Sequence, residues 1–170
     1  MNENKIYNVL FICTGNSARS ILAECILNWD GKGRFKAFSA GSHPAGRVHP
    51  MALDILKSKS FPTDSLRSKD WAEFERPTSP SIDFIFTVCD NAAGEVCPIW
   101  PGQPVTAHWG FPDPAAFEGE EAAQREVFLN VFNQIQSRIR MFVNLPIASL
   151  DKISLQQHLN EIGQTLLKTA

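Results

Sequence analysis

Residues 7–20 read Tyr7-Asn8-Val9-Leu10-Phe11-Ile12-Cys13-Thr14-Gly15-Asn16-Ser17-Ala18-Arg19-Ser20. The part up to Cys13 is mostly apolar and β-prone, which is typical of a strand buried on both faces of a parallel sheet. A glycine-containing turn follows, and apolar residues at helical spacing then continue from Ala18 to Trp29. This stretch therefore predicts a strand, a tight turn and a helix in immediate succession.

Strand and helix patterns alternate along the rest of the chain. They predict strands over 35–40, 82–88 and 105–107, helices over 48–59, 120–143 and 149–168, and loops over 71–81 and 89–102. Such alternation favours an α/β domain with a parallel sheet. The length of 170 residues suits one domain, and the chain contains no internal repeat or linker.

Composition narrows the classes of function. Charged residues make up 20% of the chain and the formal net charge is -2, so we expect no nucleic-acid partner. No apolar run reaches membrane-spanning length and the N-terminus does not resemble a secretory signal, which predicts a cytoplasmic protein with no membrane partner. Four cysteines in a chain of this length do not suggest a secreted disulfide scaffold.

The turn between Cys13 and Arg19 has the composition of an oxyanion site. Its backbone N–H groups and the start of the following helix can point at a tetrahedral anion, and the fork of Arg19 can bind two anion oxygens. The same positive potential favours a thiolate at Cys13, which makes it a candidate nucleophile, and Ser20 is a candidate hydrogen-bond donor to that thiolate. The alternative is a purely structural role, in which Cys13 is a buried cysteine before an ordinary helix. The candidate oxyanion-binding residues are Thr14, Gly15, Asn16, Ser17, Ala18 and Arg19.

The segment Val9–Ser20 resembles the phosphate loop of the low-molecular-weight protein tyrosine phosphatases. Its Cys-Thr-Gly-Asn-Ser form resembles the arsenate reductases that share their fold, and the resemblance extends from about Lys5 to Val143. It implies a single-domain three-layer sandwich around a central four-stranded parallel sheet. The helix after about Ser149 falls outside it, so we divide the chain into a domain, 1–146, and a C-terminal helical extension, 147–170.

A second candidate site residue is Asp113, in the loop Trp109-Gly110-Phe111-Pro112-Asp113-Pro114-Ala115. Displacement at an oxyanion centre needs a proton for the leaving oxygen, which a carboxylic acid can supply. Asp before Pro also commonly initiates turns. Asp113 resembles the family's Asp-Pro general acid. Ala115 stands where the phosphatases usually carry an aromatic residue, and this form is more similar to the reductases.

Two further cysteines, Cys89 and Cys97, lie in one loop rich in small and polar residues. Because Cys89 directly follows a predicted strand, it can lie at the same sheet edge as Cys13. Thiol–disulfide exchange needs sulfurs that approach one another in turn, and this loop supplies two. The alternatives are incidental cysteines or half of a zinc site. Zinc sites usually use closer pairs and four ligands, so we expect no metal. Cys25, at an apolar helix position, is read as core packing.

Cys89 and Cys97 resemble the redox cysteines of the thioredoxin-coupled arsenate reductases. The resemblance implies that Cys13 attacks arsenate, that Cys89 attacks the sulfur of the adduct and releases arsenite, and that Cys97 then takes over the disulfide. It implies no prosthetic group; the electrons come from thioredoxin, or from glutathione and glutaredoxin. The spacing between Cys89 and Cys97 is one residue longer than in well-known members.

Some reductases of this family bind potassium beside the phosphate loop through a glutamate, a serine and an aspartate. Glu24 and Ser39 match the first two positions, and Lys69 falls at the third. We therefore predict that the Lys69 ammonium replaces the cation and pairs with Glu24; a solvated loop lysine is the alternative.

Three functions stay open from the sequence. The first is an arsenate reductase with a cysteine relay, and the second is a phosphatase acting on phosphate monoesters. The third is an arsenic- or redox-sensing module without catalysis, because fold alone does not specify activity. Cys89 and Cys97, which a phosphatase does not need, favour the reductase.

Overall fold

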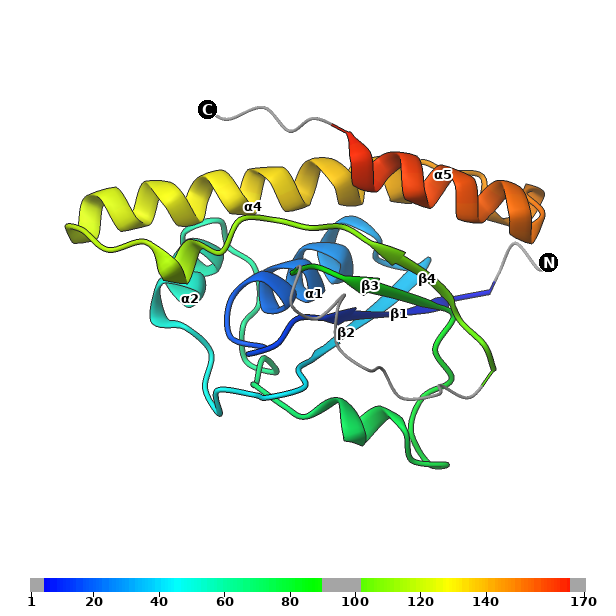
Figure 1. The fold of residues 1–170 in the computed structure, drawn as a ribbon, viewed down its shortest axis with the longest axis horizontal. Coiled ribbons are helices and arrows are strands. Elements are labelled where there is room, and N and C mark those ends of the chain that lie inside the picture. Colours follow the sequence, from blue (N-terminus) through cyan, green and yellow to red (C-terminus); the bar gives the residue numbers. More distant parts are fainter. Residues whose placement is uncertain (1–4, 90–101, 166–170) are drawn as a thin grey trace.

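A single parallel sheet forms the centre of the computed structural model, which describes residues 5–89 and 102–165 (Figure 1). Its strands are β1 (Tyr7–Ile12), β2 (Phe35–Ala40), β3 (Phe84–Thr87) and β4 (Val105–His108), in the order β2-β1-β3-β4. Every neighbouring pair is parallel. The predicted α/β fold with a four-stranded parallel sheet is therefore confirmed. Because β1 and β3 are the inner strands, the residues that follow them meet at one edge.

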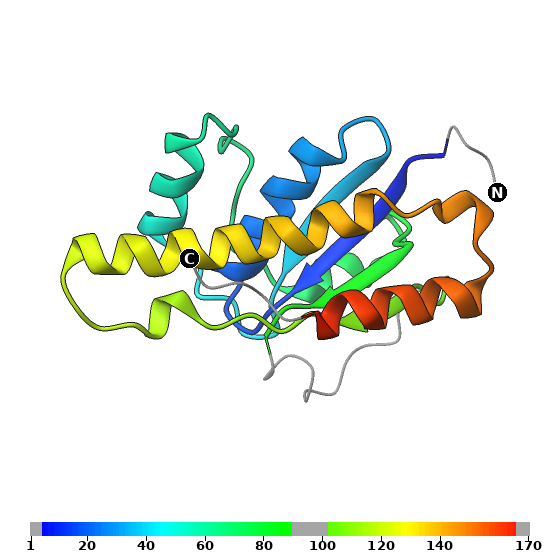
Figure 2. The ribbon, with the colours of Figure 1, turned by 90° about the horizontal axis from the view of Figure 1, so that it is seen from above.

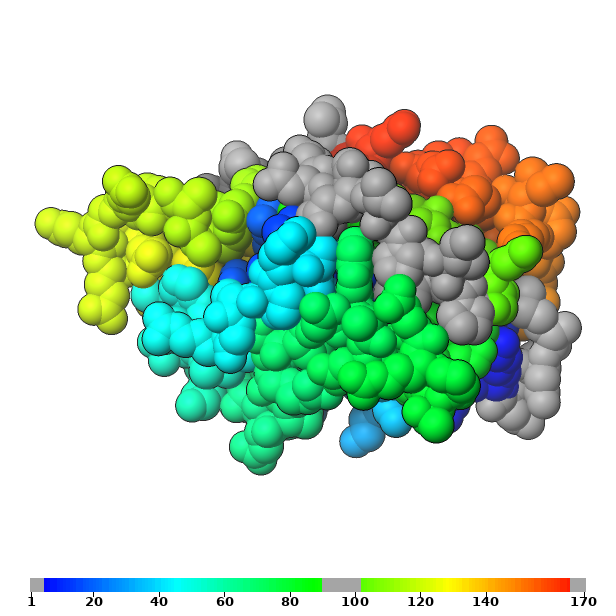
Figure 3. Space-filling view, turned by 60° about the horizontal axis from the view of Figure 1, so that its bottom comes forward, coloured from blue at the N-terminus to red at the C-terminus, as the bar shows by residue number. Residues whose placement is uncertain are grey.

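The apolar composition of β1 matches its place inside the sheet. Its residues Val9, Leu10, Phe11 and Ile12 are completely buried. In the space-filling view of Figure 3, only a little of the blue N-terminal part shows behind the cyan and green segments. A continuous apolar run is what a strand covered on both faces requires.

Four α-helices lie within the described residues: α1 (Arg19–Asp30), α2 (Pro50–Ser58), α4 (Glu121–Val143) and α5 (Lys152–Gln164). Figures 1 and 2 show α1, α4 and α5 gathered over one face of the sheet. On that face Phe142 of α4 packs against Phe35 and Phe86, with ring centroids 4.8 and 5.2 Å apart. On the opposite face Phe38 contacts Phe74. The sheet is thus covered on both faces.

Several predicted boundaries differ from those in the structure; the strand predicted over 82–88, for example, is β3, which spans Phe84–Thr87. The segment 71–81, predicted as a loop, begins with the short 3₁₀ helix η1 (Trp71–Phe74), because the Asp70 side chain accepts from the Ala72 N–H and Phe74 is buried. The last helix begins at Lys152 instead of Ser149, because Asp151 caps it by accepting from the Ser154 N–H. Residues 147–149 form a separate 3₁₀ turn, η3 (Ile147–Ser149).

The final helix shares the main core. Leu155, Leu159 and Ile162 of α5 are buried in the same apolar cluster as β1 and β3.

A third 3₁₀ turn, η2 (Pro114–Ala116), precedes α4. Within residues 5–89 and 102–165, no helix combines the length and apolarity needed to cross a bilayer.

Candidate active site

The carbonyl groups of the turn after β1 are hydrogen-bonded to a neighbouring segment, residues 43–49. The carbonyl oxygens of Thr14, Gly15 and Ser17 accept hydrogen bonds of 2.9–3.0 Å from backbone N–H groups in segment 43–49. Ala18, the residue before α1, makes no side-chain cap. With the carbonyls bonded outward and the helix start free of a side-chain cap, backbone N–H groups remain available for an anion.

Cys13 lies at the base of this turn and is 3% exposed. Its Sγ lies 2.9 Å from Ser20 Oγ, and the Asn16 N–H donates to it at 3.3 Å. Asn16 Nδ2 donates to Ser20 Oγ at 2.7 Å, so the serine oxygen already accepts one hydrogen bond. The Ser20 hydroxyl is then oriented to donate its hydrogen to Cys13 Sγ. The contact predicted for Ser20 is present.

Asn16 organises the turn. It is completely buried, and its φ of 44° lies in the left-handed region, which Asn tolerates better than most residues. Its Oδ1 accepts from the Lys69 backbone N–H at 2.8 Å. A single side chain therefore connects the nucleophile's serine partner to a segment more than fifty residues away.

Gly41 is a site residue that the sequence reasoning missed. It follows β2, and a Cβ at this position would collide with the Thr14 carbonyl oxygen and lie 2.9 Å from the Cys13 carbonyl oxygen. Only a residue without a side chain lets the loop lie this close to β2. The available signal was the position of Gly41 directly after the strand that neighbours β1.

Arg19 and Asp113 meet beside the turn. Arg19 Nη2 lies 3.6 Å from Asp113 Oδ2, and its Nη1 donates to the Phe111 carbonyl oxygen at 3.0 Å. Asp113 Oδ1 also accepts from the Ala115 N–H at 3.0 Å, which caps η2. Asp113 therefore initiates a turn, as one interpretation predicted, and at the same time lies beside Arg19. The Phe111 carbonyl was not foreseen, because a backbone acceptor leaves no trace in the side-chain pattern.

Cys89 lies two residues after the end of β3 and against the same turn. The Thr14 N–H donates to Cys89 Sγ at 3.4 Å, and Thr14 Oγ1 lies 3.7 Å from that sulfur. The side chain is 2% exposed. The second cysteine is therefore in contact with the residue next to Cys13, as the parallel arrangement of β1 and β3 predicts. Cys97 lies outside the described residues.

Cys25 differs chemically from these two thiols. It is buried in α1, and its Sγ donates to the Pro62 carbonyl oxygen at 3.3 Å. Burial, together with the nearby Glu24 carboxylate, raises the pKa of Cys25 to about 12. At neutral pH this thiol is protonated, so it does not act as a nucleophile.

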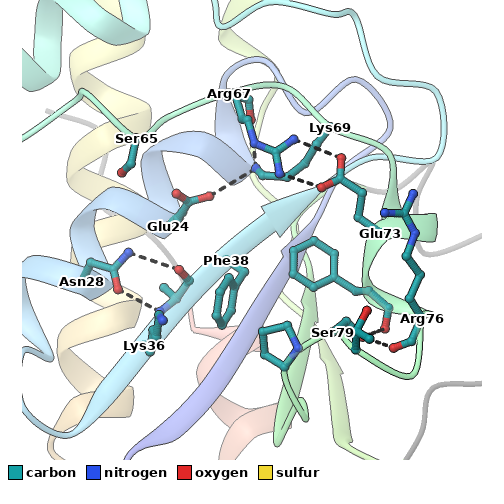
Figure 4. Close-up of a pocket in the computed structure, with 14 residues that line it drawn as sticks. Glu24, Asn28, Lys36, Phe38, Ser65, Arg67, Lys69, Glu73, Arg76 and Ser79 are labelled. Atoms are coloured by element: carbon teal, nitrogen blue, oxygen red, sulfur yellow. Dashed lines mark hydrogen bonds and ion pairs between the residues drawn. The ribbon is translucent and has the colours of Figure 1, made fainter.

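A buried ion pair lies behind the turn, as predicted from Glu24, Ser39 and Lys69. Lys69 Nζ is 3.6 Å from Glu24 Oε1 and donates to the Arg67 carbonyl oxygen at 2.8 Å. Ser39 Oγ donates to Glu24 Oε1 at 2.6 Å. Figure 4 shows Glu24 directed at Lys69 on the wall of a cavity of about 700 Å³. The Lys69 ammonium balances the charge of the buried Glu24 carboxylate, and since Lys69 is 8% exposed the solvated-lysine alternative is wrong. That this ammonium replaces a bound cation stays a prediction.

Lys69→Met is expected to destabilise the fold by about 3–5 kcal/mol, because it leaves Glu24 buried without its counter-charge. Burial already raises the pKa of Glu24 above its usual 4.5, and loss of Lys69 removes the largest opposing influence. The folded state then favours a protonated Glu24, so the loss is smaller near pH 5 than near pH 8. Urea denaturation at the two pH values measures both effects.

Glu24→Gln combined with Lys69→Met should recover part of that stability, because neither charge is then left unpaired. Lys32→Met, at an exposed turn lysine, serves as the control and should change stability by less than about 0.5 kcal/mol. Equal losses for Lys69→Met and Lys32→Met would contradict the interpretation of the ion pair.

The histidines have structural contacts in the described part of the chain. His49 caps α2 by accepting from the Met51 N–H through Nδ1, and burial together with Arg47 lowers the pKa of His49. His108 Nδ1 lies 2.8 Å from Thr87 Oγ1.

Across residues 5–89 and 102–165, no three His, Cys, Asp or Glu side chains are grouped closely enough to hold a metal ion.

Comparisons with known proteins agree with this geometry. The family profile described as low molecular weight phosphotyrosine protein phosphatase matches residues 8–156. The arsenate reductase of Halalkalibacterium halodurans is 34% identical over 145 residues, which cover 84% of this chain and 96% of that protein.

Two solved arsenate reductases have the same fold. The thioredoxin-dependent arsenate reductase of Corynebacterium glutamicum is 25% identical with a TM-score of 0.59; the match covers 83% of this chain and 62% of that one, so this chain spans less than two thirds of its length. An arsenate reductase in the phosphate binding state has a TM-score of 0.62 at 25% identity, covering 81% and 96%. Since the matched residues include the whole turn from Cys13 to Arg19 and also Asp113, the chain belongs to the low molecular weight phosphotyrosine protein phosphatase family.

Proposed function

We propose that this chain is an arsenate reductase that passes oxidation from Cys13 to Cys89 and then to Cys97. The observation that carries the proposal is the contact of Cys89 Sγ with Thr14, at 3.4 Å from its N–H. Hydrolysis of a phosphate ester needs one cysteine, whereas reduction needs a second thiol that can reach the first. The named relatives, arsenate reductases at 34% and 32% identity, support the same activity.

In the first step the Cys13 thiolate attacks the arsenic atom of arsenate. A sulfur–arsenic bond forms, and one arsenate oxygen leaves as water after receiving a proton from Asp113. The Arg19 fork and the N–H groups of residues 14–18 hold the remaining oxygens; among these N–H groups, those of Thr14 and Asn16 also donate to the sulfurs of Cys89 and Cys13. The contact between Arg19 and Asp113 supports this division of roles, since it brings the acid to the mouth of the anion site.

In the second step the Cys89 thiolate attacks Cys13 Sγ. The sulfur–sulfur bond forms as the sulfur–arsenic bond breaks, and its electron pair stays on arsenic, which leaves as arsenite. Cys97 then attacks Cys89, which frees the Cys13 thiolate and leaves a Cys89–Cys97 disulfide. An external thiol reductant supplies the two electrons that reduce this disulfide.

The burial of the first two thiols supports a shuttle. Cys13 and Cys89 are 3% and 2% exposed, so a protein reductant cannot attack a disulfide between them directly. A third cysteine that carries the disulfide to a reductant removes this obstacle. We assign the reductant to thioredoxin or to glutathione with glutaredoxin, with no prosthetic group. Both systems operate in reducing compartments, so a cytoplasmic location is part of the proposal.

Arsenate-dependent NADPH consumption tests the proposal. The full chain is expected to turn over with thioredoxin and thioredoxin reductase, or with glutathione, glutaredoxin and glutathione reductase, and one system should be faster by at least about tenfold, since exchange depends on docking and on redox potential. Omission of arsenate is the control. Absence of turnover in both systems, together with rapid hydrolysis of an aryl phosphate, would overturn the reductase assignment.

The second candidate function is hydrolysis of phosphate monoesters. The approach of Asp113 to Arg19 favours it, because ester cleavage needs only the thiolate, the anion loop and an acid. The same assay series therefore includes an aryl phosphate. A chain that binds arsenate or phosphate but catalyses neither reaction would instead be a sensing module.

A further inference from the structure

The segment 109–113, which leads to Asp113, is anchored at its start by the C-terminal helix. Trp109 is 1% exposed and stacks on Phe86 of β3 with ring centroids 3.9 Å apart. Its Nε1–H donates to the Leu159 carbonyl oxygen of α5 at 3.0 Å. The indole is therefore fixed by the sheet on one side and by α5 on the other. Leu159 lies beyond residue 156, where the match to the family profile ends.

The backbone of α5 packs so closely on this segment that no side chain fits between them at Gly163. A Cβ at Gly163 would lie 2.5 Å from the His108 carbonyl oxygen and 2.9 Å from Trp109 Cδ1. Gly163 is the penultimate residue of α5. The close approach of α5 to residues 108–109 requires a residue without a side chain at this position.

Arg138 of α4 holds the next residues. It is 5% exposed, and its guanidinium lies 4.7 Å from the centre of the Phe111 ring. Its Nη1 donates to the Gly110 carbonyl oxygen at 2.9 Å and its Nη2 to the Thr165 carbonyl oxygen at 3.3 Å. One side chain thus joins the end of α5 to the segment whose next carbonyl, that of Phe111, accepts from Arg19.

The stability of the fold does not explain this arginine. Burial lowers the pKa of Arg138, and in the described part of the chain its Nε has no hydrogen-bond partner. A buried charge with an unsatisfied donor is unfavourable, and an apolar side chain of similar length is often as stable or more so. Its two hydrogen bonds and its contact with the Phe111 ring fit a role in placing the groups that it touches.

We propose that Arg138 and α5 are positioning elements for the active site: they hold residues 109–111 so that the Phe111 carbonyl orients Arg19 and Asp113 faces the anion site. The inference rests on the proposed function, because it assumes that Arg19 and Asp113 take part in the reaction. It assigns a role to a helix that extends beyond the family match.

Arg138→Met tests the proposal in the full-length protein. Met fills the space but removes both hydrogen bonds, so the rate of arsenate-dependent Cys13 oxidation in a single turnover should fall about tenfold to a hundredfold, the cost of a small misplacement. The midpoint of urea unfolding of Arg138→Met should stay at the wild-type value. Arg140→Met, on an exposed side chain of the same helix, should leave the rate unchanged.

A double-mutant cycle with Asp113→Asn separates positioning from general damage. Because Arg138 acts through both Asp113 and Arg19, Arg138→Met should slow Asp113→Asn clearly less than it slows the wild-type chain, since one of the two groups that it places is already gone. Multiplying effects would overturn the proposal, and so would an unchanged rate in Arg138→Met. An unchanged rate in Asp113→Asn alone would instead count against Asp113 as the acid in the proposed function.

Gly163→Ala tests the contribution of α5 independently. The added methyl must displace the His108–Trp109 backbone, so we expect a rate loss like that of Arg138→Met. Gln164→Ala, at the exposed neighbouring position, is the matched control and should keep the full rate. Equal rates for the two variants would contradict a positioning role for α5.

Discussion

Cys13→Ser is expected to abolish both arsenate reduction and phosphate ester cleavage, with a fall in rate of about 10⁴-fold or more. A serine hydroxyl is a weak nucleophile unless a base removes its proton. The groups that contact position 13, the Ser20 hydroxyl and the Asn16 N–H, are hydrogen-bond donors to a thiolate and not bases. Steady-state NADPH consumption and aryl phosphate release measure the loss.

Anion binding provides the control for this variant. The turn from Thr14 to Arg19 is held by backbone contacts with segment 43–49 that do not involve the sulfur. Cys13→Ser should therefore still bind arsenate or inorganic phosphate, as measured by calorimetry. A rate within tenfold of wild type would show that Cys13 is not the nucleophile.

Cys89→Ser has the second largest expected effect and separates the two candidate reactions. Without the second thiol the Cys13–arsenic adduct has no internal attacker, so multiple turnover of arsenate should fall at least about 10³-fold, to the background. Hydrolysis of an aryl phosphate should stay within about threefold of wild type, because it needs only Cys13, Arg19 and Asp113. Both assays are run on the same preparation.

Cys25→Ser is the matched control for Cys89→Ser. Cys25 is also buried, yet its raised pKa keeps it protonated, and a serine can donate the same hydrogen bond to the Pro62 carbonyl oxygen. Arsenate turnover should therefore be kept. Normal arsenate reduction by Cys89→Ser would refute the relay, whereas loss of both reactions would mean that Cys89 supports the loop structurally.

The central part of the site could be predicted because its signals are local. The order of buried strand, glycine turn and helix over residues 7–30 depends on neighbouring residues, and the structure has β1 and α1 within one residue of the predicted limits. The contact between Cys13 and Ser20 follows from the same turn. The position of Cys89 beside Thr14 needed one further assumption, that β1 and β3 are parallel neighbours.

Other features had no local signal. Segment 71–81 contains prolines that suggest a loop, but Phe74 packs on Phe38 of β2, and this contact together with the Asp70 cap holds residues 71–74 in a 3₁₀ helix. The pairing of Glu24 with Lys69 came from the family resemblance and not from spacing. Gly41 and Gly163 look like ordinary glycines until the backbone that faces each of them is known.

The sequence alone determined which groups are the candidates for the chemistry: a cysteine and an arginine on one strand–turn–helix unit, a second cysteine after another strand, and an Asp-Pro loop. These are fixed by short-range geometry, since a strand, a turn and a helix start place side chains only a few residues apart. The tertiary structure decided how those groups are held. The contacts of Asn16 with Lys69, of Arg19 with Phe111, and of Arg138 and α5 with residues 109–110 are hydrogen bonds to backbone N–H and carbonyl groups. They depend on packing between distant segments and leave no pattern along the chain.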